Sequence, residues 1–428
     1  MTAVRLIAYE PGHFHAALVQ KEMLPGIAPR VHVYATLGPD LLSHLSRIAS
    51  FNSRCDNPTA WEVEVHTSND PLSRMLEERP GNVVVISGRN RGKIDAILAS
   101  LRAGLHVLAD KPWVITTGDL SKLDEAIRTA RENRLIALDI MTERHEITAA
   151  LTRRLIADSE VFGEPNSGTA HRPGVILESV HYLCKNVAGK PLRRPAWFFD
   201  VEQQGEGLAD VGTHLVDLVS WTLFADQSVT ADDVELLRAS RTPTILSRAD
   251  FGRVTGEADF PPNLSECIRS GQLLHHVNTT CLYRVRGLHV WLNVGWEFEA
   301  PPGRGDYHFA RYSGTKSDIE IRQGENEQFI PEVYVIPHTN DVEAALYRWV
   351  AQLSQQYAGL GLDTVRGAYR LVIPEMYRTG HEAHFAEVTR RFLAYRNDPS
   401  TLPAWETDNL RAKYYLTTHG VRLARASD

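Results

Sequence analysis

Short apolar runs alternate with amphipathic stretches over the first third of the chain. Residues 83–87 (VVVIS) and 107–109 (VLA) have the apolar pattern of buried strands. Residues 94–103 between them repeat apolar side chains at helical spacing. The same alternation predicts strands at 4–8, 31–35 and 135–139 and helices at 16–23 and 120–133. Strands and helices in alternation indicate a parallel, doubly wound α/β sheet, so we predict a Rossmann domain over residues 1–141.

The pattern changes after residue 141, where longer strand-like runs replace the regular alternation. We therefore predict an α+β domain with a large, mostly antiparallel sheet over residues 142–428, ending in a helical C-terminal extension. Its predicted helices are 147–158, 213–223, 342–357 and 384–395, and its predicted strands are 279–286, 288–296, 317–322 and 332–336.

Composition and charge exclude several classes of protein. The 428 residues are 43% hydrophobic and 23% charged, which is typical of a globular protein of two or three domains. A net charge of −7 gives no basic footprint for nucleic acid. The sequence has no signal-peptide pattern and no apolar run long enough to span a membrane, so we expect a cytoplasmic protein with no membrane partner. The four cysteines have no CxxC spacing, which predicts reduced thiols.

A lysine follows one of the predicted strands. Lys111 ends the string GLHVLADK, directly before Pro112, and the string has the pattern of a helix end, a buried strand and a turn. Open α/β sheets bind ligands at the carboxyl edge of their strands, which is where this cation would lie. A turn without any catalytic role is the alternative interpretation.

An acid and a histidine stand four residues apart in the second part of the chain. Asp210 and His214 in DVGTH would face the same way on a helix, as a proton-handling pair requires. Asp210 is also a residue type favoured as a helix cap, so capping is an alternative role.

Both segments resemble motifs of one family. ADKP at 109–112 matches the Glu-Lys-Pro motif of the glucose-fructose oxidoreductase and inositol dehydrogenase family (Gfo/Idh/MocA), and GLADVGTHLVD at 207–217 is similar to its Asp-x-Gly-x-His-x-x-Asp segment. The resemblance covers roughly residues 1–320, with the two motifs in the family's order. It implies a nicotinamide-dependent oxidoreductase that acts on sugars or polyols, and it supports a homodimer or homotetramer.

The expected cofactor loop departs from the family pattern. The stretch after the first strand is AYEPGHFH instead of Gly-x-Gly-x-x-Gly. We take Gly12 as the third glycine of the family loop, with the continuation His13, Phe14 and His15, and we expect these residues to contact the cofactor. Glu10 would repel a phosphate if its side chain pointed inward.

The remaining cofactor contacts are expected at two later strand ends. Ser87 and Asn90 resemble the family's loop beside the nicotinamide ribose, and Asp110 with Lys111 and Pro112 forms the second contact. No acid, arginine or lysine directly follows the strand at 31–35, so the sequence favours NAD only by the absence of a cation, and NADP stays open.

The chemistry of alcohol oxidation assigns a role to each candidate. His214 would remove the hydroxyl proton as general base, because its ordinary pKa of about 6.5 suits proton exchange near neutrality. Lys111 would donate a hydrogen bond to the same oxygen. Asp210 would orient the substrate or His214, and Asp217 would support that histidine from behind.

Substrate contacts are predicted at Arg144 and Trp197. Arg144 matches a family position after the domain crossover, although an interdomain ion pair is equally compatible with it. Trp197 begins WFFD at 197–200, which resembles the family's strand leading to the catalytic helix, and an aromatic ring there could stack on a sugar. Core packing is the alternative for these aromatic residues.

Several histidines lie outside the family motifs. Glu178 and His181 are three residues apart, as metal ligands on a helix would be, but no second cluster accompanies them and we predict no metal. For His275-His276, and for His381 and His384 in the C-terminal extension, we expect packing, in the extension against the cofactor domain, with a regulatory or lid role as the alternative.

The sequence thus predicts an NAD(P)-dependent oxidoreductase that transfers a hydride from a secondary alcohol of a sugar, glycoside or cyclitol. Two alternatives come from other classes. One is a glycoside lyase or hydrolase that oxidises its substrate transiently before elimination. The other is a non-catalytic protein that binds a sugar or nucleotide.

Overall fold

The computed structural model describes residues 3–187 and 190–427. By their contacts these residues form two compact units: unit 1 contains residues 1–142 and 380–414, and unit 2 contains residues 143–379 and 415–428. The sequence analysis placed residues 380–414 in the second domain, whereas their contacts place them in unit 1. The long helix α12 (Ala404–Ala426) begins in unit 1 and ends in unit 2.

Unit 1 contains a parallel sheet with the strand order β3-β2-β1-β4-β5-β6. This is the predicted Rossmann arrangement, in which the order reverses between β1 and β4. Its strands are β1 (Leu6–Tyr9), β2 (Arg30–Ala35), β3 (Glu62–Thr67), β4 (Val83–Ile86), β5 (His106–Asp110) and β6 (Ala137–Ile140). Its helices are α1 (His15–Leu18), α2 (Pro39–Ser53), α3 (Pro71–Glu78), α4 (Lys93–Arg102), α5 (Leu120–Glu132) and α11 (His381–Asn397).

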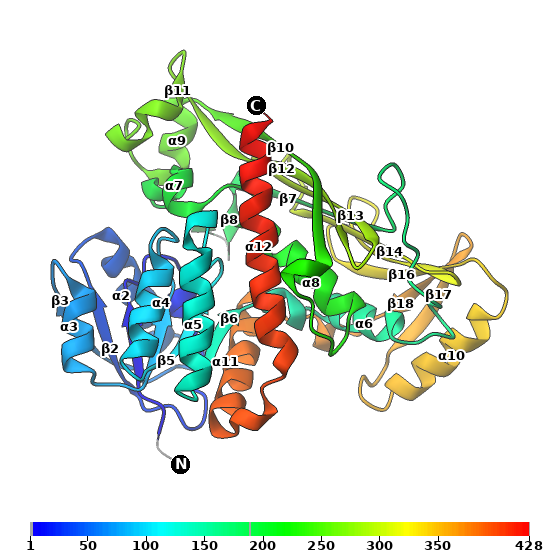
Figure 1. Cartoon of the computed structure of the whole chain (residues 1–428), viewed down its shortest axis with the longest axis horizontal. Coiled ribbons are helices and arrows are strands. Elements are labelled where there is room, and N and C mark those ends of the chain that lie inside the picture. Colours follow the sequence, from blue (N-terminus) through cyan, green and yellow to red (C-terminus); the bar gives the residue numbers. More distant parts are fainter. Residues whose placement is uncertain (1–2, 188–189, 428) are drawn as a thin grey trace. The chain divides into compact units, whose positions relative to one another are not determined.

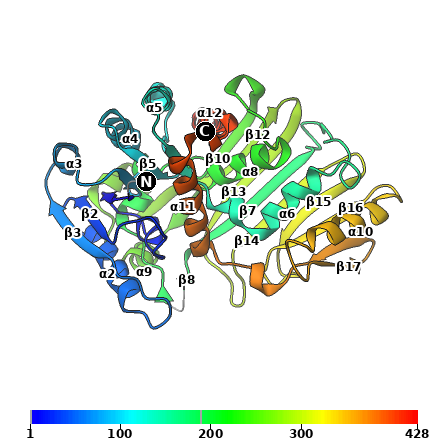
Figure 2. The ribbon, with the colours of Figure 1, turned by 90° about the horizontal axis from the view of Figure 1, so that it is seen from below.

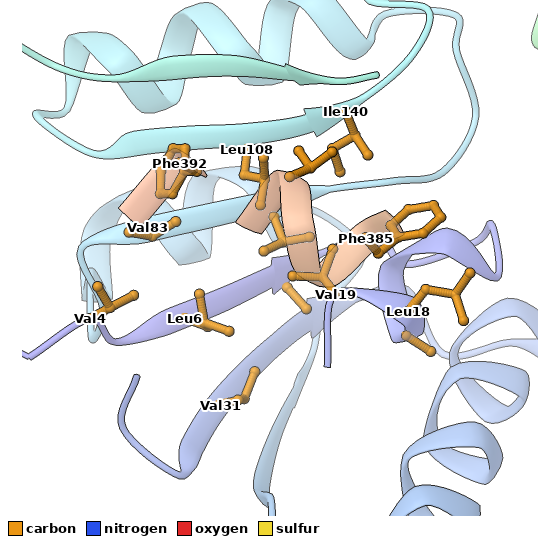
Figure 3. Packing of buried hydrophobic residues seen from close by; sticks show 14 of the residues in the cluster. Val4, Leu6, Leu18, Val19, Val31, Val83, Leu108, Ile140, Phe385 and Phe392 are labelled. Carbon is orange, nitrogen blue, oxygen red and sulfur yellow. The ribbon is translucent and has the colours of Figure 1, made fainter. Parts of the chain in front are cut away.

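Two apolar layers cover the two faces of this sheet. On one face, α3, α4 and α5 pack on the strands with side chains such as Met75, Ile97 and Leu123. On the other face, α2 and the short α1 are joined by α11, whose Phe385 and Phe392 contact the strands (Figure 3). Figure 2 shows α4 and α5 on one side of the strands and α2 and α11 on the other.

Helix α1 is shorter than predicted. The expected helix over residues 16–23 is limited to His15–Leu18, because the backbone after Leu18 enters a series of turns that lead to β2. Leu18 and Val19 still point into the apolar layer beside Phe385 (Figure 3). The area that a longer α1 would cover is filled by α11.

Unit 2 contains a mixed, mostly antiparallel sheet with the strand order β10-β12-β13-β7-β14-β15-β16-β18-β17, and β11 pairs with β12. The neighbours β7 and β13 are parallel. Helices α6 and α8 contact each other and pack on one face of the sheet (Figures 1 and 2). The strands are β7 (Val175–Cys184), β10 (Val234–Leu246), β11 (Ile268–Arg269), β12 (Gln272–Val285), β13 (Leu288–Glu299), β14 (Tyr307–Ser313), β15 (Ser317–Gln323), β16 (Glu332–Pro337), β17 (Gly361–Val365) and β18 (Ala368–Val372), with a separate pair β8 (Asn186–Val187) and β9 (Lys190–Pro191). The helices are α6 (Ile147–Ile156), α7 (Val201–Gln204), α8 (Gly212–Leu223), α9 (Arg248–Thr255) and α10 (Val342–Leu353). This sheet confirms the predicted α+β architecture.

No helix among the described residues combines the length and the apolar character needed to cross a lipid bilayer.

Candidate active site

Asp110 and Lys111 lie at the carboxyl edge of the unit 1 sheet. Asp110 is the last residue of β5, and Lys111 follows it with only 9% of its surface exposed. The Lys111–Pro112 peptide bond is cis. The sequence prediction of a lysine at the ligand-binding edge of the sheet therefore holds for unit 1.

The buried carboxylate of Asp110 is contacted by hydrogen-bond donors that follow two other strands, β1 and β4. His15 Nδ1 lies 2.9 Å from Asp110 Oδ2, and Ser87 Oγ donates to the same oxygen at 3.2 Å. His13 Nδ1 is 3.4 Å away. The structure thus brings together four of the predicted cofactor-contacting residues, from the ends of β1, β4 and β5.

The protonation states follow from burial and charge. Burial lowers the pKa of His15 to about 3, against the opposing attraction of Asp110. For Asp110, burial favours the neutral acid, but the adjacent His15 and His13 outweigh it and hold the pKa of the carboxyl well below its usual value. At neutral pH Asp110 is therefore a carboxylate that accepts a hydrogen bond from the neutral imidazole of His15. Asp110 Oδ1 is buried and has no hydrogen-bond partner among the described residues, so it is an acceptor available to a bound molecule.

Lys93 is a buried cation at this edge that the sequence analysis did not single out. Its ammonium donates to Asn90 Oδ1 at 2.6 Å and to the carbonyl oxygen of Asp110 at 3.0 Å. Only 3% of Lys93 is exposed. It therefore fixes the predicted ribose-contacting Asn90 against the backbone just before Lys111. The signal was its position at the start of α4, directly after the loop that resembles the family's ribose contact.

The loop after β1 has its own construction. The carboxylate of Glu10 accepts hydrogen bonds from Thr36 N at 2.9 Å and Thr36 Oγ1 at 2.8 Å, which ties it to the residue after β2. A side chain at Gly12 would come within 3.0 Å of the Asp40 carboxylate, and one at Gly88 within 2.3 Å of the carbonyl oxygen of Glu10. Gly88 therefore needs glycine because a side chain there would clash with the backbone, whereas at Gly12 the side chain of Asp40 could move aside. The carboxylate of Glu10 is therefore bound at the end of β2 and does not point into the turn beside Gly12.

In unit 2, Asp210 and His214 flank the beginning of α8. Asp210 lies in the turn before the helix, and His214 in its first turn. The N-cap residue of α8 is Val211, whose side chain makes no capping hydrogen bond, and Asp210 directly precedes it. Asp210 is buried, and its charge acts on Arg194 and His275.

Arg144 and Asp217 form a buried ion pair within unit 2. Arg144 Nε donates to Asp217 Oδ2 at 2.6 Å, and Nη2 donates to Oδ1 at 2.7 Å. The sequence left an interdomain ion pair as the alternative to a substrate contact of Arg144; this ion pair lies inside one unit and connects the segment before α6 to α8. A two-point contact of this kind holds both side chains in one geometry. Asp217 is a residue of α8, so its ion pair with Arg144 holds this helix in place.

The WFFD segment at 197–200 is not the predicted strand. Residues Ala196–Phe199 form a 3₁₀ helix, and Trp197, Phe198 and Phe199 are all buried. The guanidinium of buried Arg194 lies 4.6 Å from the Phe198 ring centre and 5.0 Å from that of Trp296. Burial lowers the pKa of Arg194 to about 10, with Asp210 opposing the shift. The packing interpretation therefore describes these aromatic residues, and Arg194 is a buried cation beside them that the sequence analysis did not identify.

Glu178 and His181 lie on a strand, not on a helix. In β7 an odd spacing puts them on opposite faces, which excludes the pair as ligands of one metal ion. His181 instead joins a polar row with Ser179 Oγ at 2.7 Å and Asp306 Oδ2 at 3.3 Å. Lys185 donates to the same Asp306 oxygen at 2.6 Å. Despite burial, His181 and Lys185 lower the pKa of Asp306 to about 2.

The C-terminal histidines lie in unit 1. His381 is the first residue of α11, and its ring centre is 5.6 Å from that of His15. His384 is buried. The expected packing of this extension against the cofactor domain is confirmed.

Comparison with known proteins identifies the family. Residues 151–425 match the family described as "Putative oxidoreductase C terminal domain". A structure described as a putative oxidoreductase from Parabacteroides merdae is 42% identical to this chain. It covers 100% of this chain and 98% of its own, with a TM-score of 0.97. The chain belongs to the Gfo/Idh/MocA oxidoreductases.

Two further proteins are similar to this chain, one in part of its sequence and one in its fold. D-glucoside 3-dehydrogenase of Escherichia coli K12 is 27% identical over 188 residues, which are 42% of this chain and 44% of that protein. This chain thus matches less than half the length of that curated relative. Levoglucosan dehydrogenase, solved with NADH, shares the fold at 13% identity and a TM-score of 0.63, covering 100% of this chain and 98% of its own.

Proposed function

We propose that this protein is a nicotinamide-dependent dehydrogenase that oxidises a secondary hydroxyl group of a sugar, glycoside or cyclitol. NAD is the proposed cofactor, His214 the general base, and Lys111 the donor to the reacting oxygen. The proposal extends the family assignment, which by itself gives an oxidoreductase.

The observation that carries the proposal is the polar cluster at the carboxyl edge of the unit 1 sheet. Clusters of buried charged groups at a sheet edge favour a binding or catalytic role. Here Asp110 ends β5, Lys111 follows it, and Lys93 at the start of α4 donates to the carbonyl oxygen of Asp110. The unpartnered Asp110 Oδ1 and the amide of Asn90 fit the hydroxyl and amide groups of a nicotinamide riboside. The four-residue helix α1 supplies little helix dipole, so the grip on the pyrophosphate would come mainly from backbone amides of the loop after β1.

The chain's own residues handle the proton and the oxygen. When bound, the nicotinamide ring supplies the acceptor for the hydride that leaves the carbinol carbon. His214 takes the hydroxyl proton as the carbon–oxygen double bond forms. Lys111 donates a hydrogen bond to that oxygen and stabilises the negative charge that develops on it. The Arg144–Asp217 pair positions α8, and through it His214.

Glu10 supports NAD over NADP. An acidic side chain at the end of the second strand commonly binds the adenosine ribose hydroxyls and repels a 2′-phosphate. β2 itself supplies no such acid, but the carboxylate of Glu10 is bound to Thr36 at that position. Glu10→Gln should therefore raise the ratio of NADP to NAD turnover, by about tenfold if the repulsion amounts to ~1.4 kcal/mol.

Two similar proteins support a carbohydrate substrate. One is a D-glucoside 3-dehydrogenase and the other a levoglucosan dehydrogenase. Both names denote dehydrogenation of a sugar derivative, which is the reaction class that the candidate residues suit.

The first experiment measures NADH formation with NAD or NADP and a set of methyl glucosides, anhydrosugars and cyclitols. His214→Gln and Lys111→Met should each lower kcat/KM about 10²–10⁴-fold. The exposed His171 and the partly exposed Lys122, both outside the proposed site, give the matched controls His171→Gln and Lys122→Met, which should keep full activity.

Three outcomes separate the proposal from its alternatives. Unchanged kcat/KM in His214→Gln would overturn the assignment of the base. Substrate conversion without net NADH would favour transient oxidation and elimination. Absence of any bound nicotinamide in mass spectra of the purified protein, and of binding in calorimetry, would favour a non-catalytic role.

A further inference from the structure

Polar side chains from two parallel strands meet on one face of the unit 1 sheet. β3 is an edge strand, and its register with β2 pairs Glu64 with His32 and His66 with Tyr34. Residues paired across strands, and residues two apart along a strand, share a face. His32, Glu64 and His66 therefore point to the same side of the sheet, the side that carries α3. They lie within the strands and take no part in the Asp110 cluster.

The donor atoms of these three residues form a small triangle. His32 Nδ1 lies 3.1 Å from His66 Nε2 and 3.7 Å from Glu64 Oε2. His66 Nε2 lies 3.6 Å from Glu64 Oε1. In a tetrahedral zinc site with bonds of about 2.0–2.2 Å, neighbouring donor atoms are about 3.3 Å apart. The triangle thus has the dimensions of three corners of such a site.

A second carboxylate, that of Glu78, lies beside the other ring nitrogen of His66. Glu78 Oε2 lies 3.3 Å from His66 Nδ1 and also accepts from Tyr34 Oη at 2.5 Å. Metal-binding imidazoles characteristically donate their other N–H to a carboxylate, which leaves the first nitrogen with its lone pair. The Tyr34 ring stacks on His66 with centres 4.4 Å apart and planes at 4°.

Arg74 is the cation nearest to this arrangement. Its Nη2 donates to His66 Nδ1 at 3.4 Å, and its Nε donates to Glu78 Oε1 at 2.8 Å. In this arrangement the proton of His66 is on Nε2, so an ion bound at Nε2 requires that proton to move to Nδ1, where Glu78 can accept it. The charge of Arg74 is balanced by Glu78, so Glu64 is left to balance part of the charge of a bound dication.

A hydrogen bond between the two imidazoles is the simpler explanation for their 3.1 Å contact. It leaves the Glu64 carboxylate 3.6–3.7 Å from both rings, beyond hydrogen-bond distance of either. A divalent ion explains both the carboxylate and the two facing nitrogens.

We propose that His32, Glu64 and His66 bind a zinc-class divalent cation, with a water molecule as fourth ligand on the solvent side of Glu64. The ion would connect the edge strand β3 to β2. The proposal is independent of the dehydrogenase activity and revises the expectation from sequence that the protein has no metal site.

Cobalt(II) provides the probe, because its visible absorption is strong only in tetrahedral sites. Tag-free full-length protein, stripped with a chelator and titrated with cobalt(II), should bind one equivalent with these bands, and excess zinc(II) should remove them. Zinc should also raise Tm by several degrees, because it binds the folded state. Absence of tetrahedral bands, or a Tm unchanged by zinc, would overturn the proposal.

Variants locate the site. Glu64→Gln changes only a half-exposed side chain, so folding is not at risk, and it should weaken binding at least tenfold; Glu78→Gln should weaken it about 10–100-fold through His66. His32→Gln with His66→Gln should abolish it, whereas His171→Gln should leave it unchanged. The other clustered ligands, His13, His15 and Asp110, give the competing site. Binding that survives in Glu64→Gln but is lost in His15→Gln would show that the ion binds there, and would overturn the proposal.

Discussion

The two faces of the unit 1 sheet are covered in different ways. On one face, α3, α4 and α5 follow one another along the chain and pack on strands that precede or follow them directly. On the other face, α2 and the four-residue α1 are completed by α11, which begins at His381. Leu410 and Tyr414 of α12 also join the first apolar layer. The difference is that three local helices form most of the first layer, whereas the second layer depends on α11 to complete it.

Helix length explains why the second face needs α11. At about 1.5 Å per residue, four residues of α1 span only about 6 Å, whereas the 17 residues of α11 span about 25 Å. The exposed apolar surface of β1, β4 and β5 would otherwise face water. This surface is buried by three side chains on one face of α11, spaced about one helical turn apart: Phe385, Val388 and Phe392. Figure 3 shows the two phenylalanines.

The largest expected effect is the loss of a phenylalanine from α11. Phe392→Ala should lower the free energy of unfolding by about 3–5 kcal/mol, because the ring is 1% exposed and its removal leaves a cavity. Urea denaturation followed by circular dichroism measures the change. Glu387→Ala on the exposed side of the same helix should change it by less than about 1 kcal/mol. If both variants were equally stable, α11 would not be part of this core.

Leu101→Ala on the other face tests whether the locally built layer is equally important. This side chain is fully buried on α4, and its removal should cost about 2–5 kcal/mol in the same assay. A cost below about 1 kcal/mol would mean that the α11 face alone stabilises the sheet.

Acid should weaken the packing on the sheet face that α11 covers. Burial lowers the pKa of His44 on α2 to about 4, so between about pH 6.5 and 4 the unfolded chain binds a proton that the folded chain does not. The contribution of His44 to stability is complete above pH 6.5 and is lost as pH falls toward 4, at up to about 1.4 kcal/mol per pH unit. Other histidines whose pKa values are lowered by burial, such as His15 and His106, add to the loss. The loss between pH 7 and pH 5, measured by urea denaturation, should therefore be about 2 kcal/mol smaller in His44→Gln than in the unchanged protein. A loss that His44→Gln leaves unchanged would exclude His44 as its source.

A smaller effect is expected where α12 contacts β6. Tyr414 Oη donates to the buried carboxylate of Asp139 at 2.7 Å, beside Lys413 Nζ at 2.9 Å. Tyr414→Phe should cost about 1–2 kcal/mol, because one acceptor on a buried charge loses its donor. Thermal denaturation of Tyr414→Phe, with Tyr415→Phe as the neighbouring control, measures it. No loss would show that Lys413 alone satisfies Asp139.

The smallest effect is expected at the exposed pair between α12 and α5. Arg411 Nε lies 2.6 Å from Asp124 Oδ1, and both side chains are nearly half exposed. Arg411→Ala should change the unfolding free energy by about 0.2–1 kcal/mol, and less at 1 M salt. A cost above about 2 kcal/mol would mean that this pair, and not the apolar contacts of Leu410 and Tyr414, attaches α12 to α5.

Strands with a continuous or alternating apolar pattern were visible in the sequence, and the polar edge strand β3 was not. VVVI at 83–86 is apolar throughout and predicts β4 directly. The edge strand β3 has the sequence EVEVHT and no buried residue, so its pattern gives no apolar face to detect. The same polar character hid the His32, Glu64 and His66 cluster, because its members come together only through the pairing of β2 with β3.

The candidate active site shows the same division. Its motifs and their order could be found in the sequence, because Lys111 and His214 follow recognisable strand and helix patterns. The partners could not be found. Asp110 meets His15 across 95 positions and Arg144 meets Asp217 across 73, and no local spacing encodes such contacts.

The sequence by itself determined the alternation of strands and helices in unit 1 and the positions of the catalytic candidates, because periodicity and turn residues act over a few neighbouring positions. The tertiary structure alone decided that α11 covers the sheet, that Glu10 is bound at the end of β2, and which charges are paired inside each unit. These outcomes depend on burial, and burial is settled only when segments distant in sequence compete for the same apolar surface.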